Sequence, residues 1–137
     1  MSIPAAVRRQ VWTRANSRCE YCQMPSDFDP APFEVDHVVP EKMDGPTVVQ
    51  NLALACFKDN NHKGPNIAGI DPLTGGKEFI CDPWKDAWSE HFWWDGAILE
   101  ARTAKGRTTI AILQMNDPHR IAHRRQLIRE GVFPPAS

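Results

Sequence analysis

Four cysteines give this chain its clearest metal-binding potential. Cys19 and Cys22 are separated by two residues, a spacing at which two thiolates can share one tetrahedral metal ion. A redox pair or a chance pairing would give the same spacing. Cys56 follows, but the position three residues after it, where a second pair would be completed, holds Asp59. Cys81 has no partner at metal-binding spacing, and we expect a small buried hydrophobic side chain there.

A second set of polar residues lies between and after these cysteines. Asp36 and His37 are adjacent, and Asn51 and Asn60 follow in order. An imidazole that titrates near neutral pH can take a proton from water. Carboxylate and amide oxygens are ligands that hard divalent cations prefer. Each residue alone is more often a turn, cap or surface residue, so the functional interpretation depends on their order and spacing together.

Hydrophobic periodicity and turn residues predict the elements that position these side chains. Residues 4–16 are expected to form a helix with Pro4 in its first turn. Residues 33–39 are rich in β-branched and aromatic side chains and are expected to form a strand. We expect Thr47 to cap a short helix that runs through about Cys56. Residues 60–63 should begin another helix.

The second half of the chain is expected to contain irregular structure followed by helices. Residues 66–78 contain several glycines and prolines and are predicted to be irregular. A short strand at 97–101 and helices over 104–115 and from Asp117-Pro118 to about Glu130 should follow. Two groups of large side chains stand out: tryptophans expected to pack a satellite core (Trp84, Trp88, Trp93 and Trp94) and arginines expected on a solvated helix face (Arg120, Arg124, Arg125 and Arg129).

Residues 19–64 resemble the HNH endonuclease family, whose fold is the ββα-metal motif. The matching segments are CEYC, FEVDHVVP, DGP, NLALAC and DNNHKG. The family pattern has a cysteine pair, an Asp-His near a strand end, an Asn in an Asn-Leu-x-Leu-x-Cys segment, and a second Cys followed by Asn or His and then Lys. This sequence meets each of those elements except the second Cys. The flanking sequence also resembles a bacterial subgroup, so the resemblance extends over most of the chain.

The resemblance implies a metal-dependent endonuclease that hydrolyses phosphodiester bonds in DNA. It assigns His37 as the general base, with Asn51 holding the loop whose backbone carbonyl fixes the tautomer of that histidine. Asp36 and Asn60 would be the two protein ligands of one divalent ion. Mg²⁺ or Mn²⁺ fits two oxygen ligands best, and Ni²⁺ and Zn²⁺ are further options.

Two residues near the end of the matching stretch are candidates for contact with the substrate. His62 lies close to Asn60 in sequence, and Lys63 carries a positive charge that could bind a phosphate. A solvated position is the alternative for both residues.

Family members with both cysteine pairs use four cysteines to bind a structural zinc ion. Here Cys19, Cys22 and Cys56 are in place, and Asp59 stands at the fourth position. A carboxylate is an established zinc ligand, so a Cys₃Asp site is one option. The other options are completion of the site by His62 or by the fourth cysteine, or no zinc and a turn held by packing.

Charge and composition limit the class of protein. The chain has 137 residues and a formal net charge of −1, which excludes a histone-like protein and a strongly acidic tail. Residues 1–18 carry four Arg and no acidic residue, and residues 102–137 carry seven basic and two acidic residues. The near-zero total predicts weak DNA binding in the absence of divalent metal. No segment approaches the ~18 apolar residues of a membrane helix, and no secretion signal is present, so a cytoplasmic protein is expected.

The sequence therefore predicts one α+β domain over residues 1–137, with a motif core at 19–64 and an extension at 65–137. The expected architecture is a ββα-metal core with a short antiparallel hairpin, an N-terminal helix and additional C-terminal helices. The expected function is an endonuclease that acts on double-stranded DNA. The alternatives are a non-catalytic, zinc-stapled nucleic-acid-binding module on the same scaffold, and a zinc-stapled module that ignores nucleic acid. The missing fourth cysteine and the weak overall charge favour the first of these alternatives, and the retention of Asp36, His37 and Asn60 opposes it.

Overall fold

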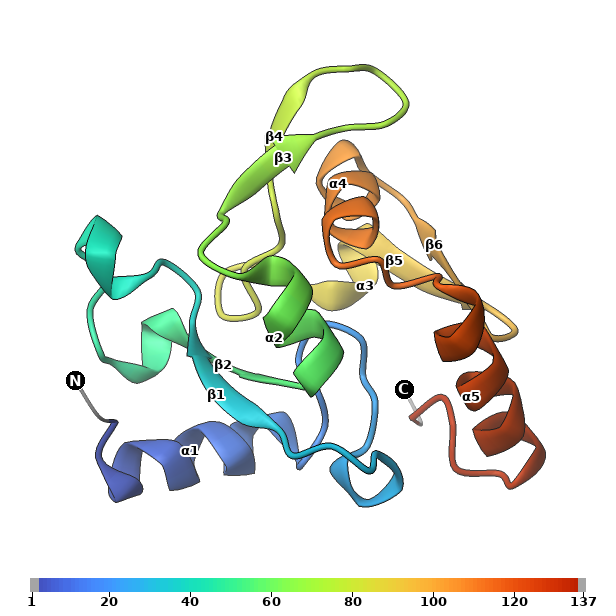
Figure 1. Cartoon of the computed structure of the whole chain (residues 1–137), viewed down its shortest axis with the longest axis horizontal. Helices are drawn as coiled ribbons and strands as arrows, with labels where there is room; N and C mark the ends of the chain where they lie inside the picture. Colours follow the sequence, from blue (N-terminus) through green and yellow to red (C-terminus); the bar gives the residue numbers. More distant parts are fainter. Residues whose placement is uncertain (1–2, 136–137) are drawn as a thin grey trace. The chain divides into compact units, whose positions relative to one another are not determined.

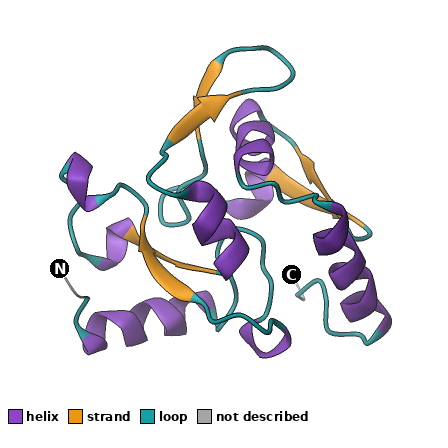
Figure 2. Cartoon of the chain, viewed as in Figure 1, coloured by secondary structure: helices purple, strands orange, loops and turns teal. Residues whose placement is uncertain are grey.

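The computed structural model describes residues 3–135. Within these residues, helices alternate with three two-stranded antiparallel sheets, which makes the fold α+β as predicted (Figures 1 and 2). The chain divides into two compact units, Met1–Ile67 with Asp82–Lys85, and Ala68–Cys81 with Asp86–Ser137. A single domain over the whole chain stays a prediction.

The first unit is built around one β-hairpin. Its main elements are α1 (Ala5–Ala15), β1 (Glu34–His37), β2 (Leu52–Ala55) and α2 (Phe57–Lys63). β1 pairs with β2 in antiparallel register, with Glu34 opposite Ala55 and His37 opposite Leu52. In Figure 1 the hairpin runs between α1 and α2, and both helices contact it. Single-turn 3₁₀ helices are inserted at Ser26–Phe28, Glu41–Met43 and Val49–Asn51.

α1 matches the helix predicted over residues 4–16. Pro4 precedes its first residue, and Asn16 ends it in the left-handed conformation with φ 53°. The guanidinium of Arg14 donates to the Glu20 carboxylate at 2.6 Å and to the Leu52 carbonyl at 2.6 Å. Glu20 in turn accepts from the Leu54 backbone N–H at 3.0 Å. These charge-assisted hydrogen bonds fasten the end of α1 to β2.

The prediction of a helix from Thr47 to about Cys56 is wrong. Val49–Asn51 forms one 3₁₀ turn, and the following Leu52–Ala55 is a strand whose four residues are all fully buried. A strand that is buried on both faces is apolar at every position, so its pattern resembles that of a buried helix. Pairing with β1 decides the outcome, and it supplies the short antiparallel hairpin that was predicted.

α2 begins three residues earlier than the predicted start at residue 60. Cys56 is its N-cap, and the Cys56 sulfur accepts from the Asp59 backbone N–H at 3.5 Å. Gly64 ends the helix with a positive φ of 51°, a conformation that glycine adopts readily.

The second unit contains two hairpins and three helices. Its elements are β3 (Ala68–Ile70), β4 (Lys77–Phe79), α3 (Trp88–His91), β5 (Phe92–Asp95), β6 (Ile98–Ala101), α4 (Ala104–Ile112) and α5 (Pro118–Arg129). The strand predicted at 97–101 and the two C-terminal helices are confirmed as β6, α4 and α5. β3 pairs with β4, and β5 pairs with β6.

The prediction of irregular structure at 66–78 is wrong, because this segment contains the β3–β4 hairpin. Asp71 organises its turn: the carboxylate accepts from the Leu73 backbone N–H and from the Thr74 hydroxyl, both at 3.0 Å. Arg107 of α4 donates two further hydrogen bonds to Asp71, at 2.9 and 2.8 Å. The turn is therefore held by a charged partner distant in sequence, which local glycine and proline content does not reveal.

The prediction that the four arginines of α5 lie on a solvated face is wrong for two of them. Arg125 and Arg129 are exposed, but Arg120 and Arg124 are buried. Arg124 donates to the Ala97 carbonyl at 2.8 Å and to the Met115 carbonyl at 2.9 Å, and Arg120 donates to the Leu113 carbonyl at 2.9 Å. The Leu113 and Met115 carbonyls follow the end of α4 and the Ala97 carbonyl lies in the β5–β6 turn. Carbonyls outside regular structure need donors, and the long arginine side chains supply them.

The predicted satellite core of tryptophans is confirmed for two of the four. The ring centroids of Trp88 and Phe92 are 5.2 Å apart, and those of Trp94 and Phe133 are 4.9 Å apart. Trp84 and Trp93 are instead exposed at 45% and 40% of their surface. The guanidinium of Arg124 lies 5.1 Å from the Trp94 ring, so a cation–π contact joins the aromatic group to α5.

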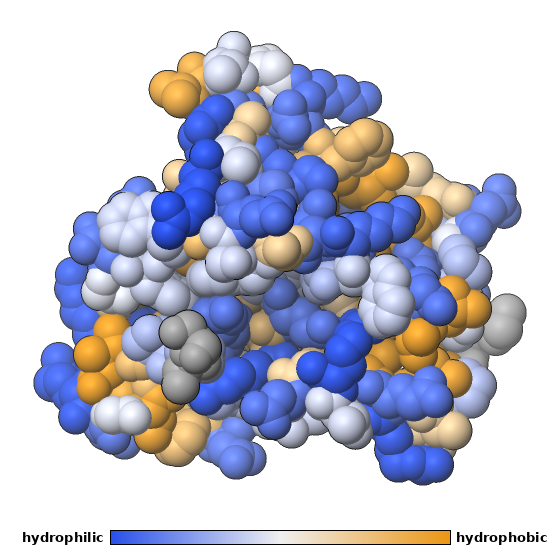
Figure 3. All heavy atoms as spheres, turned by 180° about the vertical axis from the view of Figure 1, so that it is seen from behind, coloured by the Kyte–Doolittle hydropathy of each residue, from blue (hydrophilic) through white to orange (hydrophobic). Residues whose placement is uncertain are grey.

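The surface is mixed in character. Figure 3 shows a face on which hydrophilic residues predominate, with apolar spheres at the top of the view, where the β3–β4 hairpin lies. Ile70, Leu73 and Phe79 of this hairpin are among the exposed large hydrophobic residues. None of the described helices has the length and hydrophobicity needed to span a bilayer.

The ion pair between Asp71 and Arg107 predicts a pH-dependent stability. The guanidinium of Arg107 holds the pKa of Asp71 well below its ordinary value. A carboxylate with a lowered folded-state pKa stabilises the fold above its unfolded pKa of about 3.9, and the contribution is lost as the pH falls further. Asp71→Asn should therefore lower the melting temperature at pH 7, and its difference from the parent protein should shrink below pH 4.

Thermal melts at several pH values between 3 and 7 test this prediction. Asp95→Asn, at an exposed carboxylate at the end of β5, is the matched control and should change little. A difference between parent and Asp71→Asn that is the same at every pH would contradict the ion-pair explanation.

Candidate functional site

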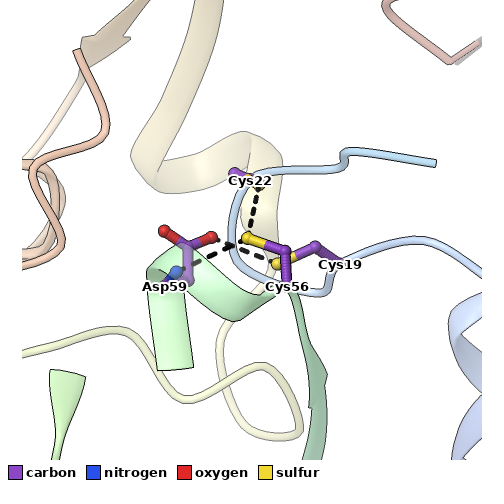
Figure 4. A group of neighbouring side chains, drawn as sticks. All are labelled: Cys19, Cys22, Cys56 and Asp59. Carbon is purple, nitrogen blue, oxygen red and sulfur yellow. Dashed lines mark hydrogen bonds between the residues drawn. The ribbon is translucent and has the colours of Figure 1, made fainter. Parts of the chain in front are cut away.

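Three cysteines and one aspartate form a compact buried cluster. Cys19, Cys22, Cys56 and Asp59 each offer a ligand atom, and these atoms all lie within 4.8 Å of one another. The Cys19 thiol donates to an Asp59 carboxylate oxygen at 3.1 Å, and the Cys22 and Cys56 sulfur atoms are 3.8 Å apart. Figure 4 shows the four side chains directed toward a common centre. All three cysteines are free thiols.

Local structure brings the four donors together from two segments. Cys19 and Cys22 lie on a tight turn, closed where Gln23 N–H donates to the Cys19 carbonyl at 2.8 Å. Cys56 lies at the start of α2, and Asp59 lies one helical turn later. The turn after α1 thus meets the beginning of α2, which is the arrangement that a metal ion would cross-link.

The chemistry of this cluster fits a zinc ion. Burial, together with the neighbouring Cys22 and Cys56 thiols, raises the pKa of the Cys19 thiol well above its ordinary value. A raised pKa favours the neutral thiol in the absence of a cation, whereas a bound divalent ion would favour the thiolates of the three cysteines. Three sulfur ligands and one carboxylate oxygen make a four-coordinate set of the kind that zinc accepts.

The second group of side chains lies where the end of β1 meets α2. The Lys63 side chain is completely buried, and its ammonium nitrogen lies 3.2 Å from Asp36 Oδ2. The same ammonium donates to the His37 backbone carbonyl at 3.2 Å. Burial raises the pKa of Asp36, and the charge of Lys63 opposes that rise. Lys63 was expected at the surface or on a substrate phosphate, but in this arrangement its charge is directed at Asp36 and His37.

The ring of His37 is held through one of its two nitrogens. Nε2 lies 2.9 Å from the Thr47 hydroxyl and 3.7 Å from a Glu41 carboxylate oxygen. The side chain keeps 14% of its surface exposed, so the ring is reachable from solvent. The resemblance implied a backbone carbonyl as the partner that fixes the tautomer of this ring. In this structure a side-chain hydroxyl occupies that place.

Asn51 closes the loop that follows His37. Its buried amide group accepts from the Val39 N–H and donates to the Val39 and Pro46 carbonyls, each at 2.9 Å. Gly45 packs so closely against the same loop that a Cβ atom there would overlap the Val39 carbonyl oxygen. The amide therefore ties together the two ends of the segment 39–46. This geometry is the one expected of a loop-holding residue, and a part in catalysis stays a prediction.

The remaining predicted site residues lie on α2. Asn60 precedes Lys63 by three residues on the same helix, a spacing that places the two side chains on one face. α2 packs against β1, so this face is the one that carries Lys63 to Asp36. His62 is half-buried. Metal binding by Asn60 and substrate contact by His62 stay predictions.

A further group that the sequence did not predict lies in the second unit. Ligand atoms of Cys81, Asp86 and His91 lie within 4.8 Å of one another. The spacing of five residues between them matches no metal-binding pattern. Protein groups already bind these donors: Lys105 Nζ donates to both Asp86 oxygens, at 3.0 and 3.1 Å, and His91 Nδ1 lies 2.7 Å from the Thr103 hydroxyl. Cys81, expected to be a buried hydrophobic residue, is indeed buried.

The buried position of Lys63 generates a prediction about stability. Removing one partner of a buried ion pair leaves the other charge uncompensated and costs about 3 kcal/mol. Lys63→Met should therefore lower the free energy of unfolding by about that amount in urea denaturation. Lys58→Met, at an exposed lysine of the same helix, is the matched control. Equal stability of the two variants would show that Lys63 makes no net contribution through Asp36 and His37.

Comparison with known proteins identifies a segment of the chain that contains both the cysteine cluster and the Asp36–His37 group. The chain is 30% identical over 116 residues to the Septu protein PtuB of Bacillus thuringiensis, an alignment that covers 83% of this chain and 42% of that protein. The chain thus spans less than half the length of this relative. Residues 19–66, which contain the cysteine cluster and the Asp36–His37 group, match the family described as HNH endonuclease. The resemblance seen in the sequence is confirmed, and the chain carries an HNH endonuclease domain over residues 19–66.

Proposed function

We propose that the chain is a metal-dependent endonuclease that hydrolyses phosphodiester bonds in DNA, and that β1, β2 and α2 form its ββα-metal motif. One observation carries the proposal. His37, with a partly exposed ring, stands at the end of β1 directly after Asp36, whose carboxylate is directed toward α2 by Lys63. A base and an anionic ligand are thereby adjacent within a segment that matches the HNH family.

The residues of the site have separate parts in this reaction. His37 takes a proton from a water molecule, which then attacks the phosphorus atom. Asp36 and Asn60 would hold a divalent ion, Mg²⁺ or Mn²⁺ in the first instance, which would stabilise negative charge on the phosphate and the leaving oxygen. Asn51 keeps the loop after β1 in place through its three hydrogen bonds. Double-stranded DNA as substrate and a cytoplasmic location belong to the same proposal.

A zinc ion at the cysteine cluster would have a structural part. Cys19, Cys22, Cys56 and Asp59 are all buried, and a closed set of four protein ligands is typical of structural rather than catalytic zinc. The ion would join the turn after α1 to the start of α2. Because α2 also carries Asn60 and Lys63, fixing its beginning helps to place the groups at its other end.

A second candidate function is a non-catalytic nucleic-acid-binding module on the same scaffold. The observation that favours it is the Lys63 ammonium, 3.2 Å from Asp36 Oδ2. This internal cation neutralises the carboxylate that would otherwise bind the divalent ion. Such a module would bind DNA in a salt-dependent manner, without cleavage and without any need for His37.

Cleavage of supercoiled plasmid DNA separates the two candidates. We expect the purified protein to nick or cut plasmid with Mg²⁺, Mn²⁺ or Ni²⁺, and the activity to disappear with a chelator. His37→Ala should lower the rate about 10²-fold or more, because proton transfer by a positioned base contributes about that much. His119→Ala, at an exposed histidine of α5, should leave the rate unchanged. No cleavage with any metal, or equal rates for parent and His37→Ala, would favour the binding module.

Metal analysis tests the structural zinc. The protein should contain about one zinc ion per chain, and both Cys19→Ser and Asp59→Ala should lower that content. Asp59→Cys, which restores the four-cysteine pattern, should retain it, and Cys81→Ser should serve as the unaffected control. Chelation should lower the melting temperature, because binding energy at a structural site contributes to folding. A metal-free protein with an unchanged melting temperature would show that packing alone holds the turn.

A further inference from the structure

We propose that Thr47 is a positioning residue that holds His37 in the tautomer protonated at Nε2, so that Nδ1 is the nitrogen that takes the proton from water. This inference rests on the proposed endonuclease function. Its basis is the 2.9 Å separation between the Thr47 hydroxyl and His37 Nε2. A residue that determines which nitrogen is basic determines where the attacking water must stand.

The surroundings of Nε2 favour a proton on that nitrogen. A Glu41 carboxylate oxygen lies 3.7 Å from Nε2, and a carboxylate is a hydrogen-bond acceptor only. Its negative charge stabilises an N–H dipole directed toward it, whereas a lone pair at Nε2 would be repelled. The Nε2–H group then donates to the Thr47 oxygen, and the hydroxyl hydrogen remains available to another acceptor. Nδ1 keeps its lone pair.

The same arrangement suits the protonated ring. After Nδ1 has taken a proton, the imidazolium donates from both nitrogens. Nε2–H stays on the Thr47 oxygen, and the Glu41 carboxylate faces the new positive charge. The ring therefore needs no reorientation during proton transfer, which is the benefit of a preorganised site.

Thr47 is itself positioned by the hydrogen bonds that the Asn51 amide makes to the loop. The Asn51 amide donates to the carbonyl of Pro46, the residue immediately before Thr47. Gly45 is pressed against the Val39 carbonyl with no room for a side chain. A β-branched threonine has few χ1 choices, so a fixed backbone fixes the hydroxyl. Asn51 thus acts on His37 in two steps, through the loop and then through Thr47.

The sequence alone gave no sign of this contact. The resemblance assigns the tautomer-fixing part to a backbone carbonyl, and Thr47 was predicted to be a helix cap. The structure places Thr47 before the 3₁₀ turn Val49–Asn51 with its hydroxyl on the His37 ring. The hydroxyl oxygen accepts from Nε2–H, and the Glu41 carboxylate beside the same nitrogen adds to the preference for that tautomer.

Steady-state cleavage by matched variants gives the first test. Thr47→Val keeps the shape of the side chain and removes the hydroxyl, and we expect kcat to fall roughly 10–100-fold, as for other orienting partners, with KM little changed. Thr47→Ser restores the hydroxyl and should recover most of kcat. Thr13→Val, at an exposed threonine of α1, controls for loss of a hydroxyl as such. Parent-like kcat in Thr47→Val would overturn the proposal while leaving the endonuclease intact.

The tautomer itself gives a second test that does not depend on cleavage. Long-range ¹H–¹⁵N NMR correlations distinguish Nδ1–H from Nε2–H histidines, and the spectrum of His37→Ala identifies the His37 signals. We expect the Nε2–H form in the parent and in Thr47→Ser, and a mixture in Thr47→Val. An Nδ1–H ring in the parent, or an unchanged tautomer in Thr47→Val, would refute the proposal. Absence of cleavage by the parent would refute the endonuclease function separately, and the NMR result would still decide the part of Thr47.

Discussion

The antiparallel pairing of His37 with Leu52 is the contact on which both groups of functional side chains depend. This register places Asn51 next to the end of β1, where its amide closes the loop after His37. At the other end of β2 it places Cys56 at the start of α2. A slip of one residue would move the Asp36 side chain and the His37 side chain each to the face opposite its present one. The complete burial of β2 fixes the register, because any slip would break the packing of its apolar side chains on both faces.

α2 carries groups of opposite character at its two ends. Cys56 and Asp59 lie at its N-terminus, where the helix dipole favours negative charge, and Lys63 lies in its last turn, where the dipole favours positive charge. The Asp59 carboxylate at the first end and the Lys63 ammonium at the second therefore both agree with the field of the helix. Burial raises the pKa of Asp36 above its ordinary value, and the charge of Lys63 opposes that rise only in part.

The sequence predicted the family pattern better than it predicted the elements around that pattern. The order of the cysteine pair, Asp36-His37 and Asn51 carries the family pattern, because chemistry requires those residue types. Leu52–Ala55 was misread as helix, since burial on both faces removes the alternation that marks a strand. Burial of Lys63 and Arg124 was not predictable either. Each donates to a backbone carbonyl distant in sequence, Lys63 to that of His37 and Arg124 to that of Ala97, and no local pattern reveals such a partner.

The hydrogen bonds around His37 restrain the residue from two independent directions. Lys63 binds its backbone carbonyl from α2, and Thr47 binds its ring from the loop. Rotation of the ring would break the second contact, and displacement of the backbone would break the first. A general base needs both its position and its orientation fixed, because proton transfer falls off steeply with misalignment. A histidine that only capped a strand or faced solvent would need neither restraint, so their combination on a partly exposed ring supports the general-base part proposed for His37.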